Sequence, residues 1–329
     1  MKAVLIVPGE EGGHVAVADV AEPPELSAGK VLVRVHAAAL NRGELIVLAN
    51  ARSGEPRVNG VEFSGEIVEV GAGVTEWLVG DQVMGHGAQS MAEYVAVDQR
   101  ALFSKPDSMS WVEAAAIPNV FVTAHDAMVT HGGVTPDSTV LINAASSGIG
   151  TASIQIARFI GAAKIIGLSR TAGKFDQLRP LGTTHLITTD QNDWVSEVME
   201  LTDGNGVSLI IDSLGAEPLA ENLKAMALCG RLINVGRITG KTAEIDLDLL
   251  SLRRIEVIGV TFRTRTADET LSCVEAARSD LQEPIDRGEI VPVVDSVFPM
   301  ADITQAHSRL ASNQQIGKIV ITICHSKEA

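Results

Sequence analysis

The chain has 329 residues, a length that predicts two domains, each large enough to bury its own core. Lys and Arg number 26 against 41 Asp and Glu, and the net charge of −15 argues against partners such as nucleic acid or an anionic membrane surface. Only 3% of the residues are aromatic, which predicts a core of Ala, Val, Ile and Leu, as in parallel sheets covered by helices.

The apolar run at the N-terminus is shorter than a secretory signal, and no stretch of 18 consecutive apolar residues occurs. The cysteines Cys229, Cys273 and Cys324 are far apart and form no C-x-x-C pair. Neither a disulfide framework nor a thiolate zinc cluster is therefore expected. These features predict a cytoplasmic protein that acts on a small molecule.

Residues 1–120 alternate short β-rich runs, such as 31–35 and 65–70, with turns that contain Gly and Asp. This part is expected to form a compact β barrel. From residue 121 to 287 strands and helices alternate, with strands expected at 140–143, 164–168, 185–187, 208–212, 231–235 and 256–261. That rhythm predicts an α/β domain with a doubly wound parallel sheet.

Residues 288–329 return to short strands at 293–298 and 318–322, which we expect to rejoin the first domain. The substrate is then expected in a cleft between the two domains, because ligands bind at the carboxyl ends of the strands of such sheets.

The strand at 140–143 leads through small residues into a helix expected over 152–160. Unpaired N–H groups at a helix N-terminus after a buried strand bind a pyrophosphate. The usual G-x-G-x-x-G pattern is reduced here to Ala145, Ser147 and Gly150, which leaves an ordinary turn as the alternative, but the next strand completes a strand–helix–strand unit. The predicted dinucleotide contacts are Ala145, Ser146, Ser147, Gly148, Ile149 and Gly150.

After the strand at 164–168 the sequence continues with Ser169 and Arg170, and Lys174 follows closely. An NAD-binding fold places an Asp or Glu at this point to accept hydrogen bonds from the ribose, whereas Arg and Lys donate charge-assisted bonds to a 2′-phosphate. The cofactor is therefore predicted to be NADP(H). The alternative is that Arg170 and Lys174 are solvated charges at the start of a helix.

Several motifs in a characteristic order resemble a known group of enzymes. They are Ala39-Leu40-Asn41, Gly60-Val61-Glu62-Phe63-Ser64-Gly65, Val79 to Gly85, Met91-Ala92-Glu93-Tyr94, Ala144 to Gly150, Asp212 to Gly215, Gly230 to Gly236 and Ile316 to Val320. The chain resembles the medium-chain dehydrogenase/reductase superfamily, and within it the zinc-independent quinone oxidoreductase and enoyl reductase branch. The resemblance implies a GroES-like β-barrel catalytic domain at 1–120 and 288–329, and a Rossmann NADP-binding domain at 121–287.

The positions that hold catalytic zinc in the alcohol dehydrogenases of this superfamily look like Asn41, Val61 and a site near Asn119. None of these supplies a thiolate or an imidazole, so no metal is expected. By the same resemblance Asn41 lines the nicotinamide end of the cleft as the candidate catalytic residue, with a turn residue as the alternative. The resemblance also places Thr123, Val235, Gly236, Arg237, Phe262 and Arg263 beside the cofactor.

Without a metal, hydride is expected to go to an acceptor that is already activated, such as a quinone or a conjugated alkene or enal. Enoyl thioester reductases of the family often carry a Tyr soon after this Asn, whereas Arg42 and Glu44 follow here and are expected to form an exposed pair. The proton donor is thus left open, with solvent sufficient for a quinone and with Arg42 or Glu44 as the alternative donors. Enoyl thioester reduction, and nucleotide binding with vestigial catalysis, remain as alternatives.

Two further expectations complete the interpretation. A short-chain dehydrogenase is excluded because that family needs a Tyr with a Lys four residues later. The one tyrosine of the sequence is Tyr94, and the residue four positions later is Asp98.

The apolar segment 255–260 lies near the end of the expected sheet, where an open edge would invite pairing. Relatives join two such edges, so a homodimer is expected, with an edge covered inside the monomer as the alternative.

Overall fold

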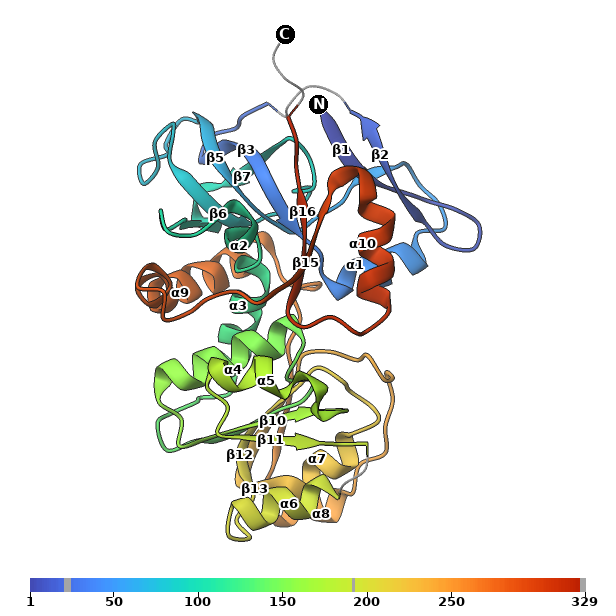
Figure 1. Cartoon of the computed structure of the whole chain (residues 1–329), viewed down its shortest axis with the longest axis vertical. Helices are drawn as coiled ribbons and strands as arrows, with labels where there is room; N and C mark the ends of the chain where they lie inside the picture. Colours follow the sequence, from blue (N-terminus) through green and yellow to red (C-terminus); the bar gives the residue numbers. More distant parts are fainter. Residues whose placement is uncertain (21–24, 191–192, 326–329) are drawn as a thin grey trace. The chain divides into compact units, whose positions relative to one another are not determined.

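The structure is a computed structural model that describes residues 1–20, 25–190 and 193–325. The chain divides into two compact units (Figure 1). Unit 1 comprises Met1–Val120 and Leu271–Ala329, and unit 2 comprises Phe121–Thr270. None of the helices within the described ranges is long and apolar enough to cross a membrane.

Unit 1 is built on a seven-stranded sheet in the order β15-β16-β3-β5-β6-β8, with β7 also paired to β3. Its strands are β3 (Lys30–Ala39), β5 (Glu62–Val70), β6 (Gln82–His86), β7 (Tyr94–Asp98), β8 (Leu102–Ser104), β15 (Val294–Pro299) and β16 (Lys318–Thr322). A second sheet has the order β2-β1-β4, with β1 (Lys2–Val7), β2 (His14–Asp19) and β4 (Arg57–Val58). These mainly antiparallel sheets confirm the expected GroES-like catalytic fold.

One apolar core holds unit 1 together. It combines inward-facing side chains of both sheets with helix α10 (Ile303–Ala311), which lies beside β15 and β16 (Figure 1). The last strand, β16, pairs antiparallel with β3, Val320 opposite Ala39, so the C-terminal segment returns to the N-terminal sheet. The remaining helices that carry residues of unit 1 are α1 (Arg42–Asn50), α2 (Trp111–Ala115), α3 (Pro118–His125) and α9 (Ala267–Asp286).

Unit 2 contains six parallel strands in the order β11-β10-β9-β12-β13-β14. Its elements are β9 (Thr139–Ile142), α4 (Gly148–Ile160), β10 (Lys164–Ser169), α5 (Phe175–Leu178), β11 (His185–Thr188), α6 (Trp194–Leu201), β12 (Val207–Asp212), α7 (Leu219–Ala225), β13 (Met226–Asn234), α8 (Leu247–Leu252) and β14 (Glu256–Gly259). Strands β10 and β11 follow one another on one side of β9, and β12, β13 and β14 follow one another on its other side. This order confirms the doubly wound Rossmann sheet.

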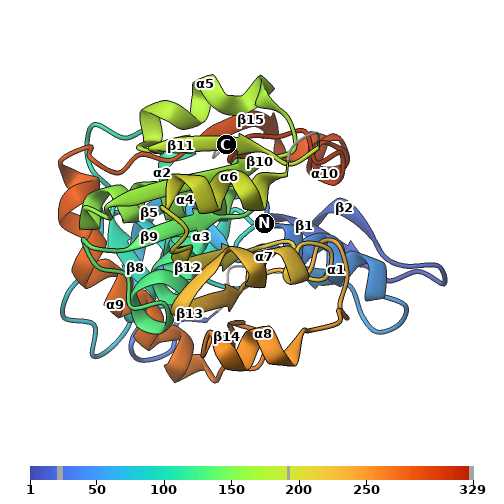
Figure 2. The same cartoon turned by 90° about the horizontal axis from the view of Figure 1, so that it is seen from below.

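Both faces of this sheet are covered. Leu141 and Ile210 share a core with Trp194 of α6 and Leu223 of α7, and α6, α7 and α8 follow one another along the sheet (Figure 2). Side chains alternate along a strand, so Ile142 faces the opposite side, and it is also fully buried. Burial on both faces explains why these strands read as continuous apolar runs.

The compact units change after Val120 and again after Thr270. The domains expected from the sequence change at residues 120 and 288, and these limits stay a prediction. Helix α9 contacts unit 1 near β8: Glu275 forms an ion pair with Arg100, which precedes this strand, and Gln282 accepts a hydrogen bond from the Ser104 amide at its end.

Candidate functional site

The turn after β9, residues 144–150, leads into the N-terminus of α4 in unit 2 and is the predicted anion-binding turn. Ala144 adopts a left-handed conformation with φ 51°, and the Ser147 amide donates to the Ala144 carbonyl at 2.8 Å. Ser147 is the N-cap of α4, and its hydroxyl accepts from the Gly150 amide at 3.0 Å. The helix therefore begins at Gly148, four residues earlier than expected, and its first N–H groups lie at the carboxyl end of β9.

Gly150 is the position where this turn tolerates no side chain. A Cβ there would lie 2.5 Å from the Ala144 oxygen and 2.6 Å from the Ala145 oxygen. The helix thus packs directly on the turn, which is the role of the third glycine in a dinucleotide fingerprint. Ala145 is fully buried and its amide donates to Leu168 at 3.0 Å, which ties the turn to β10.

The cationic residues after β10 lie beside the same turn. Ser169 ends β10 and is buried, whereas Arg170 is exposed. The Lys174 ammonium donates to the Ser146 hydroxyl at 3.3 Å, so two segments 28 residues apart meet here. The structure therefore brings together Ser146, Ser147 and Lys174 as the sequence predicted, while their contact with a nucleotide stays a prediction.

Asp212 organises the loops that follow β12 and β13. Its carboxylate accepts from the amides of Leu214 and Gly215 at 2.9 and 3.2 Å, and its own carbonyl accepts from Val235 at 2.8 Å. Burial raises the pKa of this carboxyl, and the two amides oppose that rise. Gly236 lets the loop after β13 lie close to the loop after β12, because a Cβ at this position would lie 2.2 Å from the Ser213 oxygen.

The other residues expected near the cofactor fall into separate places in unit 2. Arg237 donates to Asn234 at 3.5 Å, and Thr123 is buried in α3. Phe262 lies after β14 with the guanidinium of Arg265 4.7 Å from its ring centre, and the Arg263 amide donates to Thr261 at 3.3 Å. Arg265 in turn pairs with the buried Asp126 at 2.7 Å. This ion pair anchors the loop after β14 within unit 2.

Unit 1 holds a buried ion pair that the sequence interpretation missed. The Lys318 ammonium of β16 lies 2.7 Å from Glu62 of β5, and their side chains are 4% and 0% exposed. Lys318 also donates to the Leu40 carbonyl at 2.7 Å and to the Asn41 carboxamide oxygen at 2.6 Å. All three ammonium protons are therefore engaged. A lysine inside the apolar strand of residues 318–322 was the sequence signal for a buried partner.

The carboxamide of Asn41 is held between these two charges. Its oxygen accepts from Lys318 and from Asn119 at 2.7 Å, and its nitrogen donates to Glu62 at 2.8 Å and to the Ala39 carbonyl at 3.3 Å. Both lone pairs and both protons are in use. Asn41 and Asn119 thus meet as expected, but a ligand could reach a polar atom of Asn41 only by breaking one of these bonds.

Glu44 and Arg42 are not the exposed pair that was expected, and that expectation was wrong. Glu44 is 4% exposed and forms a capping box, because its carboxylate accepts from the Asn41 amide at 2.9 Å. Asn59 donates to the same carboxylate at 2.9 Å, and Arg42 points away toward Leu310 at 3.3 Å. The capping bonds thus hold the Glu44 carboxylate inside the protein at the start of α1.

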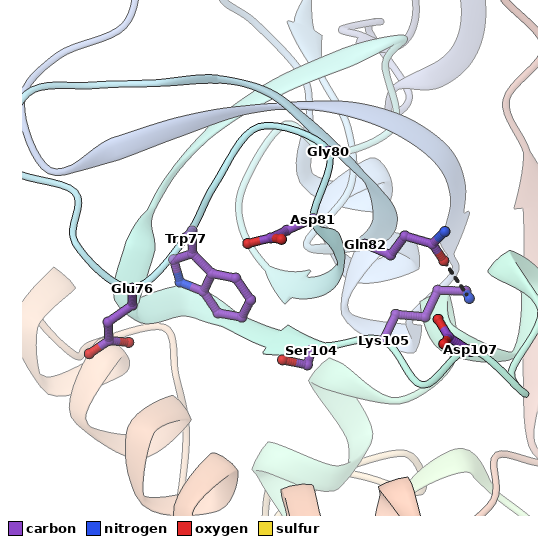
Figure 3. Close-up of a pocket in the computed structure, with 8 residues that line it drawn as sticks. All are labelled: Glu76, Trp77, Gly80, Asp81, Gln82, Ser104, Lys105 and Asp107. Carbon is purple, nitrogen blue, oxygen red and sulfur yellow. Dashed lines mark hydrogen bonds between the residues drawn. The ribbon is translucent and has the colours of Figure 1, made fainter.

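A pocket in the surface of unit 1 shares no lining residue with this cluster. Figure 3 shows its lining by Glu76, Trp77, Gly80, Asp81, Gln82, Ser104, Lys105 and Asp107. The Lys105 ammonium donates to Gln82 at 2.9 Å and lies 4.7 Å from the ring centre of Trp111. Its bonds hold it within the protein, so the pocket offers mainly carboxylates to solvent.

Comparison with known proteins decides the family. Two domain families match the sequence: the alcohol dehydrogenase GroES-like domain over residues 27–107 and the zinc-binding dehydrogenase domain over residues 148–276. The chain belongs to the medium-chain dehydrogenase/reductase superfamily. It is an oxidoreductase whose Rossmann domain binds a nicotinamide nucleotide.

Three proteins illustrate the similarity. The quinone oxidoreductase-like protein 2 homolog of Nematostella vectensis is 29% identical over 95% of this chain and 87% of its own length. A crystal structure described as an NAD-dependent alcohol dehydrogenase is 29% identical, with a TM-score of 0.86 over 98% of this chain and 100% of its own. An alcohol dehydrogenase superfamily protein from Novosphingobium aromaticivorans is 28% identical, with a TM-score of 0.88 and the same coverage.

Proposed function

We propose that this medium-chain reductase transfers hydride from NADPH to a quinone or to a conjugated alkene or enal without a metal. The observation that carries this proposal is the position of the Lys318 ammonium, 2.6 Å from the Asn41 oxygen. A fixed positive charge on one of the family's metal-holding positions opposes a divalent cation there. The description of one domain family as zinc-binding therefore does not fit the donors of this chain.

The donor set supports the same conclusion. Asn41, Val61 and Asn119 offer amide or apolar side chains, whereas zinc sites in proteins use thiolate, imidazole and carboxylate ligands. Across residues 1–20, 25–190 and 193–325, no three His, Cys, Asp or Glu side chains gather as a metal site would require. The residues present favour hydride transfer to an acceptor that needs no Lewis acid.

The cofactor preference rests on unit 2. When bound, NADPH supplies the hydride, and Arg170 and Lys174 would hold its 2′-phosphate. Their support is that Lys174 reaches Ser146 of the anion-binding turn at 3.3 Å and that no Asp or Glu follows Ser169 directly. The turn residues Ser147 to Gly150 would bind the pyrophosphate through backbone N–H groups. A homodimer in the cytoplasm, joined through β14, is part of the same proposal.

Two other functions are separated from this one by a single screen. NADPH oxidation is measured with para-benzoquinone, cinnamaldehyde and crotonyl-CoA, and NADP⁺ reduction with a secondary alcohol. Turnover with the first two acceptors is expected. Turnover with crotonyl-CoA alone would instead identify an enoyl thioester reductase, and no turnover in any arm would leave a nucleotide-binding protein with vestigial catalysis.

A further inference from the structure

Two loops of unit 2 meet at the point where the order of the strands reverses. Strands β9 and β12 are neighbours in the sheet, although β10 and β11 separate them along the chain. Doubly wound sheets bind their ligands outside the carboxyl ends of the strands at such a point. Asn143 directly follows β9 and Asp212 ends β12, and the Asn143 amide donates to the Ile211 carbonyl at 3.0 Å. Both residues therefore lie where a nucleotide is expected.

The carboxylate of Asp212 is a buried charge that neutral groups hold in place. The residue is 0% exposed, and its carboxylate accepts from the carboxamides of Asn143 at 3.4 Å and of Asn234 at 3.3 Å. The backbone amides of Leu214 and Gly215 donate to it as well. Because a buried charge is costly without such bonds, the carboxylate ties its own loop to Asn143 on one side and to β13 on the other.

The charge of Asp212 also fixes the orientation of Asn143. A carboxylate can only accept, so the carboxamide atom of Asn143 that faces it must be the nitrogen. The same nitrogen donates to Asn222 of α7 at 3.0 Å, and the facing atom of Asn222 must then be its oxygen. Asn143 and Asn222 are 1% and 0% exposed, and within the described ranges the Asn222 nitrogen has no partner. Asp212 is therefore the group that sets the direction of these bonds.

The turn of residues 144–150 depends on this support because it begins with a strained residue. Ala144 has φ 51°, a conformation that residues other than glycine rarely adopt. Strained conformations persist only where the surrounding structure fixes them. After Ala144, the Ala145 amide is bonded to Leu168 of β10 at 3.0 Å, and before it Asn143 is bonded to Asp212. The start of the turn is thus held between β10 and β12.

We propose that Asp212 is a positioning residue for the nucleotide and that it acts through Asn143 to hold the turn of residues 144–150 in the conformation that binds the pyrophosphate. This inference rests on the proposed binding of the pyrophosphate by that turn. NADPH and NADH share the pyrophosphate and differ in the 2′-phosphate. Asp212 should therefore support the binding of both nucleotides equally, whereas Arg170 should distinguish them.

A neutral substitution separates this positioning role from the direct effect of the charge. A carboxylate repels a pyrophosphate, so loss of the charge alone would tighten binding. Asp212→Asn keeps the size of the side chain but turns an NH₂ group toward a donor, which loosens the cluster. The dissociation constants of NADPH and NADH, measured by fluorescence titration of the full-length protein, should both rise by about tenfold. Unchanged or tighter binding, or a loss confined to NADPH, would overturn the inference.

Asp246→Asn is the matched control for this variant. The Asp246 carboxylate also accepts from the backbone amides two and three residues further on, those of Asp248 and Leu249, both at 3.0 Å. It caps α8, however, and is exposed. The affinities of Asp246→Asn for both nucleotides should equal those of the wild type.

A second variant tests the route through Asn143 and does not depend on the folding of Asp212→Asn. Asn143→Ala leaves the bonds of Asp212 to Leu214 and Gly215 in place, and it should weaken the binding of both nucleotides by a similar factor. In the double variant the two losses should not add, because both changes remove the same link. Additive losses would indicate a general loosening of the domain and would overturn the inference.

The titrations also separate this inference from the proposed function. Urea unfolding first shows that each variant is folded. A wild type that binds NADPH no tighter than NADH would overturn the proposed cofactor preference and leave the role of Asp212 intact. A wild type that binds NADPH but loses no affinity in Asp212→Asn or in Asn143→Ala would overturn the inference alone, and a wild type that binds neither nucleotide would overturn both.

Discussion

Lys318 and Glu62 form an ion pair of 2.7 Å whose two side chains are almost completely buried, although one comes from the last strand of the chain and the other from β5. Removing one member leaves the other charge buried and unpaired, so Lys318→Met should lower the free energy of unfolding by about 3–5 kcal/mol. Urea unfolding measures the change.

The chain offers a matched control for that experiment. Lys224 and Glu221 also form an ion pair, at 2.8 Å, but their side chains are 56% and 44% exposed. Lys224→Met should therefore change stability by less than about 1 kcal/mol. Equal losses in the two variants would contradict the role assigned to the buried pair.

Glu44 and His307 make opposite contributions to the pH dependence of stability. Their closest atoms are 3.8 Å apart, and burial raises the pKa of Glu44 to about 7 and lowers that of His307 to about 4. The folded state thus binds a proton more tightly at Glu44 than the unfolded state does, so this residue makes stability fall as pH rises from 4.5 to about 7. His307 makes stability rise as pH rises from about 4 to 6.5.

The two trends oppose each other in the wild type, and single variants should reveal each one. In Glu44→Gln the free energy of unfolding should rise as pH rises from about 4 to 6.5, where His307 titrates. In His307→Asn it should fall as pH rises from 4.5 to about 7, where Glu44 titrates. Each slope should approach about 1 kcal/mol per pH unit. Urea unfolding at several pH values checks this, and parallel curves for both variants and the wild type would refute it.

Arg170 and Lys174 should set the choice between NADPH and NADH. Each charge-assisted bond to the 2′-phosphate is worth about 1.5–3 kcal/mol, so the wild type should prefer NADPH by about tenfold or more. Arg170→Ala should raise the NADPH dissociation constant and leave that for NADH nearly unchanged. Fluorescence titration measures both constants, and equal affinities in the wild type would count against the assignment.

Gly150 should be essential to the anion-binding turn. Gly150→Ala places a Cβ 2.5 Å from the Ala144 oxygen, so we expect a loss of about 1–3 kcal/mol in stability and weaker NADPH binding. Gly43→Ala, which introduces a Cβ into open space in α1, is the control and should retain both properties. Normal NADPH affinity in Gly150→Ala would show that the turn does not hold the nucleotide.

Strand β14 should join two copies of the chain. It is the last strand of the six-stranded sheet, and Val257 in it is 42% exposed. Val257→Lys should convert a dimer into a 34.7 kDa monomer in light scattering. Leu78→Lys, at a side chain 71% exposed in unit 1, should leave the dimer intact. A wild type that is monomeric at micromolar concentration would exclude this interface.

The sequence predicted the fold well because the evidence for it is local. Apolar runs bounded by turns located β9 and β10, and the small residues before Gly150 located the turn between them. The parallel order of the sheet then followed from the alternation of strands and helices.

The polar cluster of unit 1 was harder to predict because its bonds join distant segments. Asn41 and Lys318 are 277 residues apart, and Asn119 reaches Asn41 across 78 residues. The motifs containing Glu62 and Lys318 were visible, but no local pattern shows that their side chains meet. Glu44 was placed on the surface for the same reason, since its burial depends on Asn59 and α10 packing around α1.

The rate of NADPH oxidation after complete removal of metal tests the proposed chemistry most directly. Chelator-treated protein, shown by elemental analysis to lack zinc, is assayed with para-benzoquinone and cinnamaldehyde, and with NADP⁺ and a secondary alcohol. We predict an unchanged rate with the two activated acceptors and a much lower rate with the alcohol, because no Lewis acid stabilises an alkoxide. Activity that disappears on chelation and returns with zinc, or a secondary alcohol that proves the better substrate, would contradict it.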